Sequence, residues 1–141
     1  MSINIPKLPT VRDLDIREKK VLVRIDINSP VDPDTGEILD DRRISVHGKY
    51  IKEMIKDYNP ALVLISHQGR PGEGDFISLE KHAELLSKYT ETPVKFVDDI
   101  IGPKAREEIR NLKPGEILLL ENLRLLSEAV SYTHLRAHET R

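Results

Sequence analysis

The hydrophobic pattern of the chain contains four short apolar blocks that have the length of β-strands. These blocks span residues 20–27, 61–66, 94–97 and 116–120. Their apolar runs are typical of parallel strands that are covered on both faces of a sheet. The longest runs, ALVLI and ILLL, are far shorter than the roughly 20 apolar residues that a membrane-spanning helix needs. The sequence therefore predicts strands and no membrane partner.

Three longer segments between the strands have apolar residues at three- and four-residue steps, as in amphipathic helices. The first begins after Asp40 and Asp41 and ends at Asn59-Pro60, and the third runs from about Pro103 to Pro114-Gly115. The second follows Ser78, which can cap it, and ends at Thr92-Pro93. The apolar faces consist of Ile44, His47, Ile51, Met54, Ile55 and Tyr58; of Leu79, Ala83, Leu86 and Tyr89; and of Ala105, Ile109 and Leu112.

This strict alternation of strand and helix predicts parallel pairing with right-handed crossovers. The expected fold class is α/β: a three-layer, Rossmann-like parallel sheet of about four strands with helices on both faces. A length of 141 residues suits one domain.

Charge and composition exclude several function classes. The 22 basic and 24 acidic residues give a net charge of −2, which does not favour nucleic acid as a partner. The chain has no cysteine, so disulfides, thiolate chemistry and a cysteine-ligated zinc site are excluded. The N-terminal segment lacks the pattern of a secretory signal, so a cytoplasmic location is expected.

Polar residues follow every predicted strand, at the edge where parallel α/β sheets bind ligands. They are Asp26 and Asn28; Ser66, His67 and Arg70; Asp98 and Asp99; and Glu121, Asn122 and Arg124. The topology brings Arg43, Arg70 and Arg124 to this edge, and arginine forks capture phosphate or carboxylate groups. The alternative is that Asp26, Asp98 and Glu121 neutralise the three arginines.

The loop LISHQGRPGEG, residues 64–74, does not match the known nucleotide cradles. Asp75 and Phe76 stand where a phosphate-binding lysine and a hydroxyl residue belong in a P-loop, and Pro71 replaces a glycine of the dinucleotide fingerprint. What remains is a turn that presents His67 and Arg70.

Three other patterns do not support metal sites. The segment DPDTG, residues 32–36, fails as a calcium loop because Arg43 stands in place of the bidentate glutamate. His47 and His82 are interpreted as packing or surface residues. His134 and His138 lack the glutamate of a metalloprotease helix. No metal ligand is predicted.

Five motifs occur in an order and at spacings that resemble a known family. They are VLVRIDINSP (21–30), DDRRI (40–44), LISHQGRP (64–71), KFVDDIIG (95–102) and KPGEILLLENLR (113–124). Together they resemble the N-terminal domain of the phosphoglycerate kinases, and the insertion DPDTGEILDD is most similar to archaeal members. The resemblance covers about residues 10–127.

The resemblance implies a phosphotransferase of glycolysis and gluconeogenesis that reversibly transfers a phosphoryl group between ATP and the carboxylate of 3-phosphoglycerate. Asp26 and Asn28 would contact the hydroxyl and carboxylate end of 3-phosphoglycerate. Arg43 looks like the catalytic arginine that stabilises the phosphoryl group in transfer. The substrate's phosphate would be bound by His67, Arg70 and Arg124.

The chain departs from the family pattern after residue 128. The family's second domain binds ATP and Mg²⁺, so residues 1–128 are expected to be a partial N-terminal domain that binds neither and is inactive alone. Residues 129–141 resemble a translated vector junction, and we interpret them as a non-native tail. A missing neighbour is expected to leave the last strand at an exposed edge. Family members are usually monomeric, with some oligomeric archaeal forms.

Two further hypotheses remain open at this point. A free-standing domain of this kind would be a non-catalytic binding module for a small phosphorylated acid. A signalling receiver is the third, suggested by Asp26 and the pair Asp98-Asp99, although three nearby arginines do not suit a phosphate-accepting aspartate.

Overall fold

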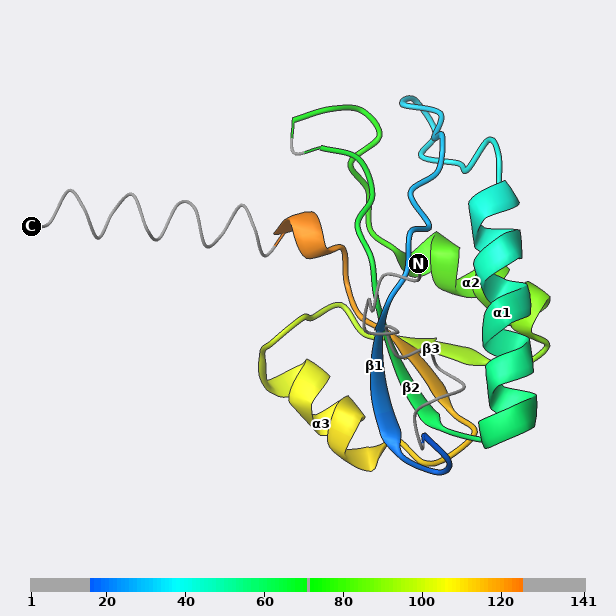
Figure 1. The fold of residues 1–141 in the computed structure, drawn as a ribbon. Helices are drawn as coiled ribbons and strands as arrows, with labels where there is room; N and C mark the ends of the chain where they lie inside the picture. The colour runs from blue at the N-terminus through cyan, green and yellow to red at the C-terminus, as the bar shows by residue number, and fades with distance from the viewer. Residues whose placement is uncertain (1–15, 71, 126–141) are drawn as a thin grey trace, which may run out of the picture.

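The computed structural model describes residues 16–70 and 72–125, which form a parallel four-stranded sheet with three helices (Figure 1). The elements in chain order are β1 (Lys20–Arg24), α1 (Arg42–Tyr58), β2 (Ala61–Ile65), α2 (Glu80–Thr90), β3 (Val94–Phe96), α3 (Pro103–Asn111) and β4 (Ile117–Leu119). The predicted α/β class and the alternation of strands and helices are confirmed. The predicted tail, residues 129–141, lies outside the described residues.

The sheet separates two hydrophobic cores, so the molecule has three layers. On one face α1 and α2 pack Ile44 and Leu86 against Leu64 of β2. On the other face α3 packs Ala105 against Val63 of β2. Figure 1 shows α1 and α2 on one side of the sheet and α3 on the other. The prediction of helices on both faces is therefore confirmed.

The strand order is β1-β2-β4-β3, which corrects the expectation that the last strand is an exposed edge. β4 pairs in parallel with both β2 and β3, with Leu64 and Phe96 flanking Leu119 in register. The crossover through α3 inserts the last strand between two earlier ones, and no pattern along the chain encodes that insertion. The edges formed by the described strands are β1 and β3.

β1 differs from the central strands in having only one face covered by described residues. Val21 and Val23 are half-buried against the core under α1, whereas the side chain of Leu22, on the other face, is 65% exposed. The expectation that the apolar runs are covered on both faces thus holds for β2 and β4 and is wrong for β1.

Helices α1 and α2 pack closely because Gly48 has no side chain. A Cβ atom placed on Gly48 would lie 2.5 Å from the Cβ atom of Tyr89. The Tyr89 hydroxyl donates a 2.6 Å hydrogen bond to Asp41 Oδ2, and this bond raises the pKa of Tyr89. Since Asp41 directly precedes α1, this contact fixes the end of the helix that carries Arg43.

The start of α2 differs from the prediction that Ser78 is its N-cap residue, because the N-cap is Leu79. The helix begins at Glu80, and the buried Glu121 carboxylate accepts hydrogen bonds from Ser78 Oγ at 2.9 Å and from the Leu79 N–H at 3.0 Å. Ser78 Oγ still accepts a hydrogen bond from the Glu80 N–H at 3.2 Å. In the part of the chain that the structure describes, no helix is long and apolar enough to cross a membrane.

Candidate functional site

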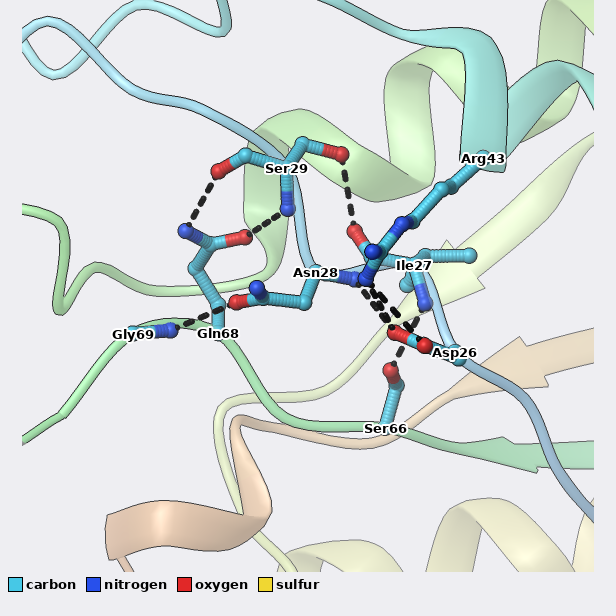
Figure 2. A network of polar contacts seen from close by, with 8 residues as sticks. All are labelled: Asp26, Ile27, Asn28, Ser29, Arg43, Ser66, Gln68 and Gly69. Carbon is cyan, nitrogen blue, oxygen red and sulfur yellow. Dashed lines mark hydrogen bonds and ion pairs between the residues drawn. The ribbon is translucent and has the colours of Figure 1, made fainter.

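The first turn of α1 and the segment after β1 meet through an ion pair between Arg43 and Asp26. Arg43 Nη1 donates to both carboxylate oxygens of Asp26 at 3.2 Å (Figure 2). Both side chains are 58% exposed, so solvent screens the pair and both groups remain accessible. The alternative, in which acidic residues neutralise the arginines, therefore holds for Asp26 with Arg43.

Asn28 connects the segment after β1 to the glycine-rich loop after β2. Its Oδ1 atom accepts a 2.8 Å hydrogen bond from the Gly69 N–H (Figure 2). Gly69 has a φ of +65°, and a Cβ atom there would lie 2.4 Å from the carbonyl oxygen of Asp75. Only glycine fits where the loop folds back so closely.

A cleft of about 560 Å³ opens beside this contact. It is lined by Asn28, Ser29, Pro30, Asp40, Arg42, Arg43 and Asp75. Arg42 donates to Asp40 from Nη2 at 2.6 Å and from Nε at 2.9 Å, and these hydrogen bonds lower the pKa of Asp40 below its ordinary value. Asp40 is therefore paired with Arg42, and the Arg43 guanidinium, whose only partner is the exposed Asp26 carboxylate among the described residues, shares the cleft with Asn28.

A second hollow of about 530 Å³ contains Arg70 and lies next to the first. It is lined by Val31, Pro33, Arg70, Glu73, Gly74 and Asp75. Because Asp75 lines both spaces, the two hollows adjoin. The predicted residues Asn28 and Arg43 thus line one hollow and Arg70 lines the other, on either side of Asp75 at the carboxyl edge of the sheet.

His67 and Arg124 follow the neighbouring strands β2 and β4 at the same edge, and both are partly exposed. With the other described residues, the side chains of His67, Arg70 and Arg124 form no hydrogen bond or ion pair. Neither His67 nor Arg124 lines the two hollows described above. A joint action of the three arginines on one anion stays a prediction.

The other acidic residues at the edge have structural partners, so they do not neutralise the arginines as the alternative expected. Asp98 pairs with Lys104 at 3.4 Å. Asp99 accepts hydrogen bonds from the N–H groups of Ala105 and Ile100, both at 2.9 Å, which lower its pKa and cap α3. Glu121 holds the start of α2, as described above.

Two buried carboxamides hold the loops of the site together: Asn122, which the sequence placed at the binding edge without a role, and Gln68, which sequence reasoning missed. Gln68 Oε1 accepts from the Ser29 N–H and Gln68 Nε2 donates to the Ser29 carbonyl, both at 2.8 Å (Figure 2). Asn122 Oδ1 accepts from the Gln68 N–H at 3.0 Å, and its Nδ2 atom donates to the carbonyls of Gln68 and Ile77. Gln68 and Asn122 are fully buried, and burial is the signal that the sequence does not show.

The described residues offer no obvious metal site. Across residues 16–70 and 72–125, no three His, Cys, Asp or Glu side chains are grouped so that they could hold a metal ion. The cleft is instead suited to a small anion, because arginine forks, an amide NH₂ group and a glycine-rich turn supply donors at one edge.

Comparison with known proteins agrees with the motifs. The family model described as phosphoglycerate kinase matches residues 11–137. The chain belongs to the phosphoglycerate kinase family. It is 60% identical over 121 residues to a phosphoglycerate kinase of Saccharolobus solfataricus and 57% identical to that of Sulfolobus acidocaldarius; each match covers 86% of this chain. The chain spans 29% of the length of these relatives.

Solved phosphoglycerate kinases have the same fold over this region. The crystal structure of phosphoglycerate kinase from Pyrococcus horikoshii aligns with a TM-score of 0.76 and 36% identity, covering 82% of this chain and 28% of that chain. The enzyme from Coxiella burnetii aligns with a TM-score of 0.63 and 31% identity over 81% of this chain. The archaeal resemblance is confirmed, and the receiver hypothesis loses its basis because Asp99 caps a helix in a phosphoglycerate kinase fold.

Proposed function

We propose that this region forms the 3-phosphoglycerate-binding half of a phosphoglycerate kinase. The whole enzyme would reversibly transfer a phosphoryl group between ATP and the carboxylate of 3-phosphoglycerate. The observation that supports this best is the cleft in which the Arg43 guanidinium and the Asn28 amide lie beside the glycine-rich loop. A small acid with two anionic ends fits donors spread over two adjoining hollows.

Each predicted residue then has a role that suits its chemistry. Asp26 and Asn28 would bind the hydroxyl and carboxylate end of 3-phosphoglycerate. Arg43 would leave its exposed pair with Asp26 at small cost, since such pairs contribute about 0–1 kcal/mol, and would stabilise the phosphoryl group in transfer. The substrate's phosphate would be bound by His67, Arg70 and Arg124.

Catalysis by such a site needs positioning and charge stabilisation more than acid–base chemistry. The attacking carboxylate is already ionised, so no general base is required. An arginine placed on the transferring group accounts for on the order of 10³- to 10⁵-fold in rate in other phosphoryl-transfer enzymes. Arg43 supplies a planar fork at the end of a rigid 17-residue helix, which suits this role.

ATP and Mg²⁺ would be held by residues outside the described part, which contains no P-loop lysine and no metal-binding cluster. We therefore expect the 141-residue chain, tested by itself, to bind 3-phosphoglycerate without turning it over. A cytoplasmic location follows from the proposed role in glycolysis.

A titration of the ¹⁵N-labelled chain with 3-phosphoglycerate tests the proposal. The backbone amides of Arg43, Arg70 and Arg124 and the side-chain NH₂ of Asn28 should shift at millimolar ligand, while Arg106 on α3 should not. Arg43→Lys should weaken binding about tenfold because lysine lacks the planar fork. Arg106→Lys, at an exposed arginine of the opposite layer, is the matched control.

Unchanged spectra from a folded chain would contradict the binding role. A coupled assay with ATP, Mg²⁺ and 3-phosphoglycerate tests whether the nucleotide is bound by residues outside the described part. Measurable turnover by the 141-residue chain alone would contradict the assignment of the nucleotide half to other residues. Binding of inorganic phosphate as tight as that of 3-phosphoglycerate would favour a general anion-binding module.

A further inference from the structure

Gln68 has all four hydrogen-bonding positions of its carboxamide occupied, although it is fully buried. Besides its two bonds to Ser29, Nε2 donates to the carbonyl oxygen of Asp75 at 3.0 Å. Its Oε1 atom lies 2.9 Å from Nε2 of His82 in α2. One side chain therefore connects the segment after β1, the far end of the glycine-rich loop and a helix.

The orientation of this carboxamide determines the tautomer of His82. The two groups of Ser29 are a backbone N–H and a backbone carbonyl, so Gln68 Oε1 must accept and Nε2 must donate. Since Oε1 is an acceptor, His82 Nε2 must carry the proton that it donates to Gln68. His82 Nδ1 is then an unprotonated acceptor, and it is buried with no hydrogen-bond partner among residues 16–70 and 72–125.

This arrangement is not the one that packing alone would favour. A buried acceptor without a donor costs stability, whereas an apolar side chain of similar size would fill the same space without that cost. Burial also lowers the pKa of His82 to about 4, so the ring is neutral near pH 7 and keeps its single donor. What the imidazole contributes at this position, and an apolar residue could not, is the hydrogen bond to Gln68.

The hydrogen bond from His82 to Gln68 affects the position of Asn28 in the candidate site. Ser29 follows Asn28 directly, and Gly69 follows Gln68 directly, so the Gln68–Ser29 pair lies immediately next to the hydrogen bond between Asn28 and Gly69 (Figure 2). Any rotation of the Gln68 carboxamide would break the bonds to Ser29 and release the Asn28 segment. His82 opposes this rotation by donating to Oε1.

We propose that Gln68 and His82 are positioning residues: His82 holds the Gln68 carboxamide in the one orientation that keeps Asn28 against the glycine-rich loop. The expected effect on binding of 3-phosphoglycerate rests on the proposed function. The hydrogen-bond geometry on which it depends is independent of that function.

The test compares His82→Leu, which removes the donor, with His82→Gln, whose amide can still donate to Gln68. His82→Met, a flexible apolar replacement, is made in parallel so that a packing failure of leucine does not decide the outcome. Thr90→Val is the matched control, because Thr90 is a buried polar residue at the opposite end of α2 whose hydroxyl donates to the Leu86 carbonyl. The two readouts are amide hydrogen exchange of Ser29 and Gly69, and the dissociation constant for 3-phosphoglycerate.

We expect His82→Leu and His82→Met to speed exchange at Ser29 and Gly69 about fivefold and to weaken binding by a similar factor, as for one lost hydrogen bond. His82→Gln should restore both to within about twofold of the original chain. Thr90→Val should lower stability while leaving both readouts unchanged. The inference is overturned if the apolar variants exchange and bind like the original chain, or if His82→Gln behaves like them.

The two proposals fail in different ways. If the unmodified chain does not bind 3-phosphoglycerate but the exchange rates respond as expected, the proposed function is wrong and the positioning role stands. If the chain binds the ligand and the His82 variants change neither readout, the positioning role is wrong and the proposed function stands.

Discussion

Asn28 Oδ1 accepts a 2.8 Å hydrogen bond from the N–H of Gly69, a residue 41 positions further along the chain. With its oxygen bound to backbone, the Asn28 amide has its NH₂ group left to act as a donor. The cleft that Asn28 lines therefore presents a neutral donor beside the Arg43 guanidinium. That combination favours a carboxylate or a hydroxyl group as the bound partner.

Asn28→Asp should separate the two roles of this side chain. A carboxylate can still accept the hydrogen bond from Gly69, so the fold should change little. It cannot donate, and it adds a negative charge to an anion site, so binding of 3-phosphoglycerate should weaken at least about tenfold. Isothermal titration measures the effect. Asn111→Asp, on the exposed end of α3, is the control, and an Asn28→Asp chain that binds normally would show that the amide does not face the ligand.

Gly48→Ala tests the close packing of α1 and α2. Alanine is the better helix former by about 1 kcal/mol, so helix propensity alone predicts stabilisation. The contact with Tyr89 predicts the opposite sign, because the new Cβ atom would lie 2.5 Å from the Tyr89 Cβ. We expect a net loss of about 1–3 kcal/mol in the free energy of unfolding, measured with urea. Lys49→Ala, at the adjacent exposed position, should change it by less than about 0.5 kcal/mol.

Asp99 should stabilise the chain through its cap of α3. Replacing a capping aspartate with alanine typically costs about 1 kcal/mol, and Asp99→Ala should cost a similar amount. Asp98→Ala is the control, because the adjacent Asp98 makes only an exposed pair with Lys104. Equal stability losses in the two variants would argue against the cap.

The same carboxylate gives a pH dependence with a defined sign. The Ala105 N–H, followed by those of Ile100, Gly102 and Lys104, lowers the pKa of Asp99 below its ordinary value of 3.8. A carboxyl group with a lowered folded-state pKa stabilises the fold above its ordinary pKa, and the contribution disappears as the pH falls through the folded value. Below pH 4, urea midpoints of Asp99→Ala should therefore fall less steeply than those of the original chain.

His82 should destabilise the fold in acid at a higher pH than the carboxylates do. Its pKa is about 4 in the folded chain, against an ordinary value of 6.5. The unfolded chain binds a proton on His82 more tightly than the folded chain does. The free energy of unfolding is therefore not reduced by this residue above pH 6.5, and it decreases as the pH falls from 6.5 to about 4. This difference in the pKa of His82 between the folded and unfolded chains corresponds to a loss of on the order of 3 kcal/mol in the free energy of unfolding once His82 is protonated in both states.

Urea unfolding of His82→Gln between pH 7 and pH 4 checks this prediction, with the pH range set by the shifted pKa. Stability of the variant should fall less with acid than that of the original chain. His47→Gln, which removes the half-buried imidazole of α1, should leave the steep acid response in place. Parallel curves for the original chain and His82→Gln would show that His82 does not remain neutral in the fold.

The sequence was sufficient for the order and type of the elements, but not for the arrangement of the sheet. Apolar runs and periodic faces are local properties, and the predicted segments correspond to the observed strands and helices. The position of β4 between β2 and β3 depends on a crossover, and the exposure of Leu22 depends on which residues cover each face. Neither the position of β4 nor the exposure of Leu22 can be predicted from the residues adjacent to it in the sequence.

Some residues of the candidate site were likewise predicted from the sequence, and others were not. Asp26, Asn28, Arg43 and Arg70 were found because charged and amide residues after parallel strands indicate a binding edge. Gln68 was passed over because nothing next to it in the chain distinguishes it from an ordinary glutamine, a residue type that is usually exposed. His82 was interpreted as a packing or surface residue, since nothing near it in the chain shows that its ring meets Gln68.

The sequence by itself determined the α/β alternation, the family and the residue types that gather at the carboxyl edge, because these depend on short-range pattern and on motif spacing. Only the tertiary structure decided which of those residues are free to bind a ligand and which hold the scaffold. Asp99 and Glu121 are carboxylates like Asp26, yet the first two accept N–H groups at the starts of helices α3 and α2, whereas Asp26, among the described residues, accepts only the nearby Asn28 N–H from backbone and pairs with Arg43 at an exposed position. The physical reason is that a carboxylate's role depends on the donors that folding places around it, and those donors come from distant parts of the chain.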